Sequence, residues 1–368
     1  MTSSARRLAL VPLMVAIAML AAACSSTSSS TSTSTSSSGP PSSAPAGSLP
    51  TTGSAPGSVP GGSGTSGGDA PGGGKTTSAG CGKTPAIAPG TIERTMTSEG
   101  VERKFQLIVP KSYDGTKALP IVFGLHALTV GYQIVPSMTG FGEMAPSYDF
   151  IGVAPSGRVA GATPYWNAAP AAENYDLDFF EELLDLLESD LCVDPSKVFS
   201  TGMSNGAQMS SLLACRMSDR ITAVAPVAGV EFFDTCKGRP VPVIAFHGTT
   251  DPIVGYDGSG LNATTIANQQ FYKGTLPEGM PVHHGVDAAM TAWAAHNGCD
   301  PEPVEDKVSN EVRRRTWQHC KAPTILYMVD GGGHAWPGKP VPAFEKQFGH
   351  GTTEIDATKL IFDFFFTS

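Results

Sequence analysis

Residues 198–207 read VFSTGMSNGA: an apolar, strand-like run enters the pattern G-x-S-x-G and continues into a helical pattern. The glycines Gly202 and Gly206 permit a tight strand-to-helix turn, which lifts the hydroxyl of Ser204 clear of a sheet. A lone G-x-S-x-G is common by chance, but here a strand signal precedes it and a helix signal follows it. The segment therefore predicts a nucleophile elbow, with Ser204 as a reactive serine.

Other short apolar runs alternate along the chain with amphipathic stretches. Continuous runs of Val, Ile and Phe are typical of strands that are buried on both faces of a parallel sheet. The predicted strands are Lys104–Val109, Pro120–His126, Phe150–Ala154, Val198–Thr201, Thr222–Val227, Val241–His247 and Thr324–Val329. The predicted helices are Asp178–Leu191, Gly206–Met217, Val286–Asn297 and Asp356–Phe365. This alternation predicts the α/β class, with a mainly parallel sheet flanked by helices.

A serine nucleophile needs a general base and an acid that orients the base. Asp251 and His334 each follow a predicted strand, so both are expected at the carboxyl ends of strands, where sites of open α/β sheets form. Taken singly, Asp251 could be a turn residue before a proline, and His334 a loop histidine. Their order after Ser204 is that of the α/β-hydrolase fold. Together the three residues predict a Ser-Asp-His triad that requires no cofactor.

The oxyanion of such a reaction needs two backbone N–H donors. The N–H of Asn205, at the start of the predicted helix, is the first candidate. The second is expected in the loop after an early strand, where the sequence leaves open the choice between Leu128 and Ala127. His126, in the same loop, is interpreted as a structural hydrogen-bonding residue.

The N-terminus has the pattern of an export signal. Two arginines precede the apolar run Leu8–Ala23, which is too short to span a bilayer, so residues 1–23 are predicted to be a signal peptide. The end of this run, LAAAC at residues 20–24, resembles a bacterial lipobox and predicts lipidation of Cys24. Cleavage without a lipid is the alternative.

Residues 24–79 consist largely of Ser, Thr, Gly, Pro and Ala. Such a segment has too little apolar surface to offset the entropy lost on ordering, so it is predicted to be a disordered linker behind the lipidated cysteine. Residues 80–368 are then the catalytic domain. We expect an extracytoplasmic protein, either a cell-surface lipoprotein or a secreted one, whose membrane contact is made by the lipid alone.

Composition and charge exclude several classes of function. The chain has 368 residues, of which 40% are hydrophobic, enough for one large core. A formal net charge of -9 without a basic cluster argues against nucleic-acid binding. The eight histidines are scattered and no C-x-x-C occurs, so no metal site is expected. We expect a monomer.

Six cysteines remain in the predicted domain after Cys24 is set aside. An even number in an oxidising compartment predicts three disulfides, although the count does not choose the pairing. These cysteines are Cys81, Cys192, Cys215, Cys236, Cys299 and Cys320.

From about Ala79 onward the chain resembles polyhydroxybutyrate depolymerase-like esterases and the feruloyl and acetylxylan esterases of carbohydrate esterase family one. The similar segments are Ser78–Lys83, Phe123–His126, Asp190–Asp194, the elbow around Ser204, Leu213–Cys215, Asn297–Cys299 and Gly333–Pro337. The resemblance implies a serine esterase of the α/β-hydrolase fold. It also implies the disulfides Cys81–Cys192, Cys215–Cys236 and Cys299–Cys320.

The resemblance further suggests that Trp166, Asn167 and Trp336 line the substrate pocket, with packing in the core or at the rim as the alternative for each tryptophan. The long connection Gly255–Gly285 is interpreted as a segment that shapes specificity. The expected substrates are small or polymeric esters: short-chain acyl esters, feruloyl or acetyl groups on polysaccharide, or hydroxyalkanoate esters. A non-catalytic glycan-binding surface lipoprotein and a serine peptidase on the same fold are the alternatives.

Overall fold

The structure of the chain is a computed structural model. It describes residues 77–83, 87–144, 147–160, 163–171, 173–259 and 281–367. The predicted signal peptide, the predicted lipidation site Cys24 and nearly all of the predicted linker lie outside these residues. So does most of the connection between Gly255 and Gly285. No helix in the described ranges is long and apolar enough to cross a membrane.

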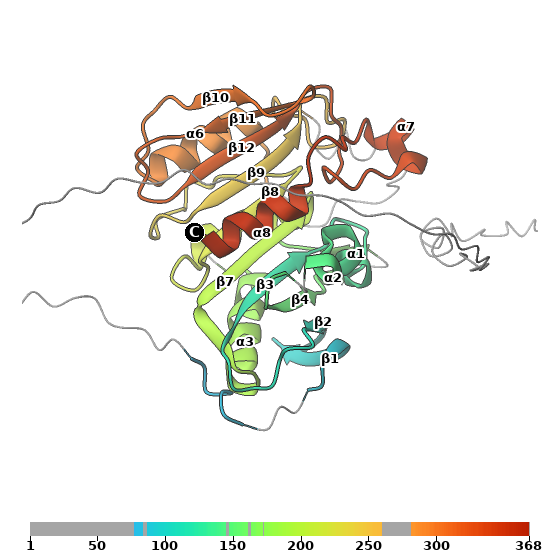
Figure 1. Cartoon of the computed structure of the whole chain (residues 1–368), viewed down its shortest axis with the longest axis vertical. Coiled ribbons are helices and arrows are strands. Elements are labelled where there is room, and N and C mark those ends of the chain that lie inside the picture. The colour runs from blue at the N-terminus through green and yellow to red at the C-terminus, as the bar shows by residue number, and fades with distance from the viewer. Residues whose placement is uncertain are drawn as a thin grey trace, which may run out of the picture. The chain divides into compact units, whose positions relative to one another are not determined.

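A single large sheet of ten strands organises the described part of the chain (Figure 1). In spatial order its strands are β1 (Gly90–Ser98), β2 (Val101–Val109), β4 (Ile151–Pro155), β3 (Leu119–Leu125), β7 (Val193–Met203), β8 (Ala223–Val227), β9 (Val243–Gly248), β12 (Thr324–Val329), β11 (Val312–Thr316) and β10 (Val304–Lys307). The six strands from β4 to β12 are parallel, and antiparallel pairs extend the sheet at both edges. A small hairpin joins β5 (Arg158–Ala160) to β6 (Thr163–Tyr165).

Helices cover both faces of the sheet, and each face has its own apolar core. Because successive side chains of a strand point to opposite faces, Val198 of β7 belongs to one core and Phe199 to the other. The first core takes in α3 (Tyr175–Asp190), α4 (Asn205–Arg216) and α6 (Val286–His296). The second takes in α1 (Val135–Thr139), α2 (Phe141–Met144) and α8 (Ala357–Thr367).

The predicted elements are all present, and the predicted α/β class is confirmed. The seven predicted strands correspond to β2, β3, β4, β7, β8, β9 and β12, and the four predicted helices to α3, α4, α6 and α8. Their ends differ by a few residues, most at β7, which is longer at both ends than predicted.

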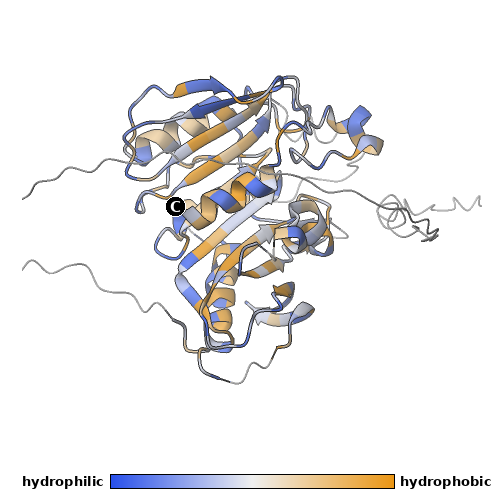
Figure 2. Cartoon of the chain, in the orientation of Figure 1, coloured by the Kyte–Doolittle hydropathy of each residue, from blue (hydrophilic) through white to orange (hydrophobic). Residues whose placement is uncertain are grey.

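The strands that the sequence pattern does not predict are the outer ones and the small hairpin. β10 reads VEDK and is exposed along its whole length, and β11 reads VRRRT with only its first residue buried. Strands like these carry no continuous apolar run. Figure 2 shows the contrast, with hydrophobic residues concentrated in the central strands and hydrophilic ones in β10 and β11.

Three disulfides join the described cysteines, in the pairings that the resemblance implies. Cys81–Cys192 ties the start of the domain to the end of α3, Cys215–Cys236 ties the end of α4 to the loop after β8, and Cys299–Cys320 follows α6. Such bonds are typical of proteins from oxidising compartments.

Candidate active site

Ser204 lies at the turn between β7 and α4 in a constrained backbone conformation. Its φ of 57° and ψ of −121° lie in a region that L-residues rarely adopt. The space around the turn admits only glycine at two positions. A Cβ atom on Gly206 would lie 2.4 Å from the carbonyl oxygen of Leu125, and one on Gly202 would lie 2.7 Å from the backbone of Gly206. The predicted elbow is therefore present as a close backbone approach, not only as a sequence pattern.

Asp251 and His334 are hydrogen-bonded to each other. Asp251 follows β9 and His334 follows β12, and the distance from Nδ1 of His334 to Oδ2 of Asp251 is 2.7 Å. A carboxylate only accepts, so this bond places the proton of a neutral imidazole on Nδ1 and makes Nε2 the basic nitrogen. Residues 83 positions apart in the sequence thus form one acid–base unit.

The environment of Asp251 favours its ionised form. Its Oδ1 accepts hydrogen bonds from the backbone N–H groups of Ile253 (2.8 Å) and Val254 (2.9 Å). Burial acts to raise the pKa of Asp251, but electrostatic attraction and the hydrogen bond from His334, together with the contributions of His247 and the Ile253 N–H, hold the pKa below its usual value. The carboxylate is therefore charged at neutral pH and can stabilise an imidazolium.

Ser204 shares a sheet edge with this acid–base pair. The parallel strands β7, β9 and β12 each end just before one of the three residues, and parallel strands have their carboxyl ends at the same edge. All three side chains are nearly buried: Ser204 is 7% exposed, Asp251 5% and His334 8%. A site at this edge is shielded from water, which strengthens its electrostatic interactions.

A second acid–histidine pair lies close to Asp251. The Nδ1 of His283 is 2.7 Å from Oε1 of Glu231, and its Nε2 is 2.9 Å from the carbonyl oxygen of Gly255. Burial acts to lower the pKa of His283, yet the Glu231 carboxylate raises it overall. Because both ring nitrogens are engaged in hydrogen bonds, to Glu231 and to the backbone of Gly255, His283 has no free nitrogen with which to act as a base. The one sequence signal for this pair is the position of Glu231 shortly after a strand.

The loop after β3 carries the other candidates for the oxyanion donors. Ala127 and Leu128 are half-buried there. Two neighbouring N–H groups are used inside the protein, since Thr129 donates to Pro164 and Val130 to Ala127. The N–H of Asn205 lies at the first position of α4, directly after Ser204.

Trp336 was expected to line the substrate pocket, but it lies in the apolar core beneath α8. Its side chain is 3% exposed, belongs to the core under α8, and donates from Nε1 to Oγ1 of Thr358 at 3.0 Å. At this exposure the core covers both ring faces, so neither is open to a sugar or phenyl ring. Trp336 is therefore a core residue, which corrects the expectation from the resemblance.

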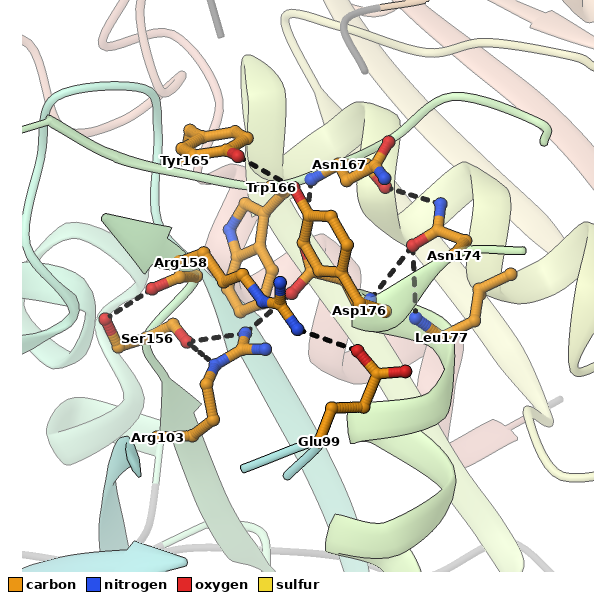
Figure 3. Close-up of polar contacts among 12 residues, drawn as sticks. Glu99, Arg103, Ser156, Arg158, Tyr165, Trp166, Asn167, Asn174, Asp176 and Leu177 are labelled. Carbon is orange, nitrogen blue, oxygen red and sulfur yellow. Dashed lines mark hydrogen bonds and ion pairs between the residues drawn. The ribbon is translucent and has the colours of Figure 1, made fainter. Parts of the chain in front are cut away.

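Trp166 and Asn167 are also buried, but they border the elbow. Trp166 is fully buried, and its Nε1 donates to the carbonyl oxygen of His126 at 3.1 Å. Asn167 is 9% exposed, and its backbone N–H donates to Oδ2 of Asp176 at 2.7 Å (Figure 3). Trp166 supports the site from within the core and presents no surface to a ligand. Asn167 is about as exposed as His334, so its place at the substrate pocket stays a prediction.

A half-buried aromatic side chain, Phe348, lies near His334, and a second, Phe344, packs against it. The ring centroid of Phe348 is 6.2 Å from that of His334, and the ring of Phe344 packs edge-on against Phe348 at 5.9 Å. They belong to a short helical segment, η2 (Pro342–Phe344) and α7 (Glu345–Phe348), none of whose residues is buried. The backbone connects this segment to the histidine, because His334 donates its N–H to the carbonyl oxygen of Phe348 at 2.6 Å.

A mainly parallel sheet flanked by helices, with a strained serine between strand and helix, defines an α/β-hydrolase. Comparison with known proteins narrows the class. Residues 97–235 match the family model described as "Putative esterase".

Among curated proteins, "Probable feruloyl esterase C" of Aspergillus clavatus is 33% identical over 216 residues, which span 56% of this chain and 74% of that protein. "Probable feruloyl esterase C" of Aspergillus niger is 29% identical over 265 residues, covering 71% of this chain and 84% of that protein. "Feruloyl esterase B" of Piromyces equi is 29% identical over 257 residues, and the match spans 45% of its length and 67% of this chain.

Among solved structures, an acetyl xylan esterase from Aspergillus awamori aligns with a TM-score of 0.47 at 14% identity, covering 69% of this chain and 97% of that one. The sequence relatives establish the family. The chain belongs to the esterase family that includes these feruloyl esterases, a family of carboxylic ester hydrolases.

Proposed function

We propose that this protein is a serine esterase in which Ser204 is the nucleophile, His334 the general base and Asp251 the acid that orients the base. His334 Nε2 takes the proton of the Ser204 hydroxyl while Oγ bonds to the ester carbonyl carbon. The tetrahedral intermediate then expels the alcohol, which receives the proton from His334. Water repeats the sequence on the acyl-enzyme and releases the carboxylic acid.

The observation that carries this proposal is the 2.7 Å bond between His334 and Asp251 at the sheet edge that Ser204 shares. A buried carboxylate held ionised by an imidazole has the geometry that stabilises an imidazolium during acyl transfer. A binding protein has no need of this pair beside a strained serine.

For the oxyanion we propose the backbone N–H of Asn205 and one N–H from the loop after β3, that of Leu128 or Ala127. Helix N-termini carry partial positive charge, and the start of α4 presents it next to Ser204. These donors would act on the carbonyl oxygen as it gains negative charge.

The test is the hydrolysis of p-nitrophenyl acetate together with labelling by a fluorophosphonate probe. We expect Ser204→Ala to abolish both, leaving at most the roughly 10³–10⁴-fold acceleration over water that binding and an oxyanion hole provide. Ser210→Ala is the matched control. This buried serine of α4 forms a side-chain hydrogen bond with Ser200 Oγ and lies in neither the proposed triad nor the proposed oxyanion hole, so its variant should keep activity and labelling. Undiminished turnover by Ser204→Ala would overturn the nucleophile assignment.

For the substrate we propose esters with compact acyl groups, including acetyl, butyryl and feruloyl groups on polysaccharide, and short hydroxyalkanoate esters. Two observations support this range: the relatives are named feruloyl esterases, and the aromatic side chain of Phe348, against which Phe344 packs, lies beside His334. Aromatic rings favour the packing of a flat or short apolar group.

A substrate panel decides between these groups. It contains p-nitrophenyl esters of increasing chain length, methyl ferulate, acetylated xylan, a hydroxybutyrate oligomer and a peptide amide. We expect the rate to be highest for short acyl chains or for the ferulate. A maximum at long chains would refute the proposed pocket, and amide cleavage without ester cleavage would indicate a peptidase.

We also propose that the protein is exported and anchored through a lipid on Cys24. The three disulfides support an extracytoplasmic location, since such bonds persist mainly in oxidising compartments. Two acyl chains suffice for stable anchoring. We expect the native protein in the membrane fraction, with a lipid adduct in its intact mass, and Cys24→Ser in the soluble fraction. A native mass without the adduct would refute the anchor.

A further inference from the structure

Trp166 forms hydrogen bonds to both segments that carry the proposed oxyanion donors. On one side it is clamped to Asn205: the backbone N–H of Trp166 donates to Oδ1 of Asn205 at 2.7 Å, and Nδ2 of Asn205 donates to the carbonyl oxygen of Trp166 at 3.1 Å. Because the side-chain amide of Asn205 bonds both the N–H and the carbonyl oxygen of Trp166, the first residue of α4 is fixed in orientation as well as position.

On the other side, the indole of Trp166 holds the loop after β3. Its Nε1 donates to the carbonyl oxygen of His126 at 3.1 Å, and the two rings lie 4.9 Å apart. That carbonyl shares a planar trans peptide with the N–H of Ala127. The direction of one group therefore sets the direction of the other, and the indole bond orients the Ala127 N–H.

The next peptide unit of this loop is held as well. The carbonyl oxygen of Ala127 accepts from Nδ1 of His126 at 2.9 Å and from the N–H of Val130 at 3.1 Å, which fixes the plane that carries the N–H of Leu128. Burial lowers the pKa of His126 to about 4, so its ring is neutral at working pH. Nε2 of His126 accepts from Gly157 N–H at 2.9 Å, which leaves the ring proton on Nδ1.

A buried ion pair anchors these contacts to the sheet (Figure 3). Nη2 of Arg103 donates to Oδ1 of Asp176 at 2.6 Å, and the side chains are 2% and 0% exposed. The other oxygen of Asp176 accepts the N–H of Asn167, the residue after Trp166. Arg103 also donates to the carbonyl oxygen of Ser156 at 2.9 Å, in the peptide unit whose N–H bonds to His126.

We infer that Trp166 is a positioning residue, which sets the relative placement of the two oxyanion-donor segments and is itself held by Arg103 and Asp176. This inference rests on the proposed function, because it concerns the donors assigned there. Oxyanion donors act only when they are already aimed at the developing charge. Removing the contacts of Trp166 with Asn205 or His126 should therefore weaken binding of the transition state more than binding of the substrate.

The test compares two equally conservative substitutions. Trp166→Phe removes the indole N–H bond to His126 but keeps an aromatic ring. Trp293→Phe is the matched control, because Trp293 is also fully buried and donates from Nε1 to a backbone carbonyl, that of Glu231, at 2.7 Å. Both should lower the melting temperature to a similar extent, since each loses one buried hydrogen bond and some ring area.

Only Trp166→Phe should impair the chemical step. We expect its kcat to fall by about 10- to 100-fold, the effect of a small misplacement of catalytic groups, with KM changed by less than about twofold. Inhibition by a trifluoromethyl ketone, which mimics the tetrahedral intermediate, should weaken by the same factor as kcat/KM falls. A kcat equal to that of Trp293→Phe would overturn the inference.

A second variant keeps the test decisive if Trp166→Phe fails to fold. Asn205→Ala retains the backbone donor but removes both bonds to Trp166, so it should show the same selective loss of kcat. With both variants in hand, the double variant should lose less than the product of the single losses, because both loosen the link that Trp166 makes between the two donor segments. If Ser204→Ala is inactive while Trp166→Phe and Asn205→Ala keep a normal kcat, the positioning role of Trp166 is refuted and the proposed function stands. An active Ser204→Ala would remove the proposed function itself.

Discussion

Ser204 has a positive φ, which serine adopts only when the neighbouring backbone imposes it. Glycines allow that neighbouring backbone to approach Ser204 closely. Gly206 lets α4 approach β3, and a Cβ atom on Gly229 would lie 2.5 Å from the carbonyl oxygen of Ser204. The elbow is thus held from two sides by backbone contacts that no larger residue permits.

Gly206→Ala should therefore lower both the melting temperature and kcat, because Leu125 or α4 must move to admit the methyl group. The control is Gly142→Ala in α2, where an added Cβ meets nothing within 4 Å. A glycine-to-alanine change in an unstrained helix stabilises by about 0.4–1 kcal/mol through the unfolded state. Thermal denaturation and ester turnover of the two variants check the prediction, and an unaffected Gly206→Ala would contradict it.

Asp251→Asn should reduce kcat by about 10⁴-fold while the fold is retained, because an amide can no longer stabilise an imidazolium and favours the wrong tautomer of His334. Glu231→Gln provides the comparison, since Glu231 pairs with His283 and not with His334. Glu231→Gln should lower the melting temperature and leave kcat largely unchanged. A larger loss of kcat in Glu231→Gln than in Asp251→Asn would show that the acid has been misassigned.

At the scale of elements, the outer strands β10 and β11 are covered by ion pairs instead of apolar contacts. Arg313 bonds Glu305 across the two strands at 2.8 Å, and its guanidinium pairs with both carboxylate oxygens of Asp330 after β12. Charged side chains on an edge also discourage pairing with another chain. These pairs are half-exposed, so each contributes little to stability.

The bond from Arg313 lowers the pKa of Asp330. A carboxyl with a depressed pKa in the folded state contributes stability that is present above its unfolded pKa and lost as the pH falls through the folded one. At pH 7, Asp330→Asn should therefore be less stable than the parent, by less than about 1 kcal/mol. At about pH 2 the parent and Asp330→Asn should unfold at the same denaturant concentration. A difference that persists in acid would indicate a packing effect.

At the scale of the whole molecule, the three disulfides close loops of different length. Cys81–Cys192 spans 111 residues, whereas Cys215–Cys236 and Cys299–Cys320 each span 21. A longer closed loop removes more entropy from the unfolded chain. The long bond also holds the start of the domain against the end of α3.

Removing Cys81–Cys192 by a double Cys→Ser change should cost about 4–5 kcal/mol of unfolding free energy, and removing Cys299–Cys320 about 3 kcal/mol. Chemical denaturation of the two variants measures both losses. The short-loop variant serves as the control for cysteine replacement as such. A larger loss from the short loop would show that native-state contacts outweigh loop closure.

Local sequence patterns were sufficient for the central architecture. A continuous apolar run such as Val243–Gly248 is buried whichever neighbours it acquires, and the glycines around Ser204 signal a tight turn wherever the sheet forms. Edge strands such as β10 lacked this signal, because β10 is held by its backbone pairing with β11 while its side chains stay exposed, so no apolar run marks it.

Side-chain roles, by contrast, depended on partners that meet only in the folded chain. Trp166 and Trp336 look alike in sequence, as flat aromatics near expected active-site segments. The N–H groups of the two buried indoles are satisfied by acceptors on His126, 40 positions away, and on Thr358, 22 positions away. The sequence pattern likewise gave no sign that Glu231 pairs with His283, 52 positions away.

Periodicity, glycine positions and chain order are local properties, and they were enough to place the strands and helices, the elbow at Ser204, and Asp251 and His334 after their strands. Which buried polar groups share a hydrogen bond became evident only in the folded chain, and with it which tryptophan is bonded to the elbow and which lies in the core. A buried polar group must find its partner wherever the assembled sheet places one, and that place is not encoded by distance along the chain.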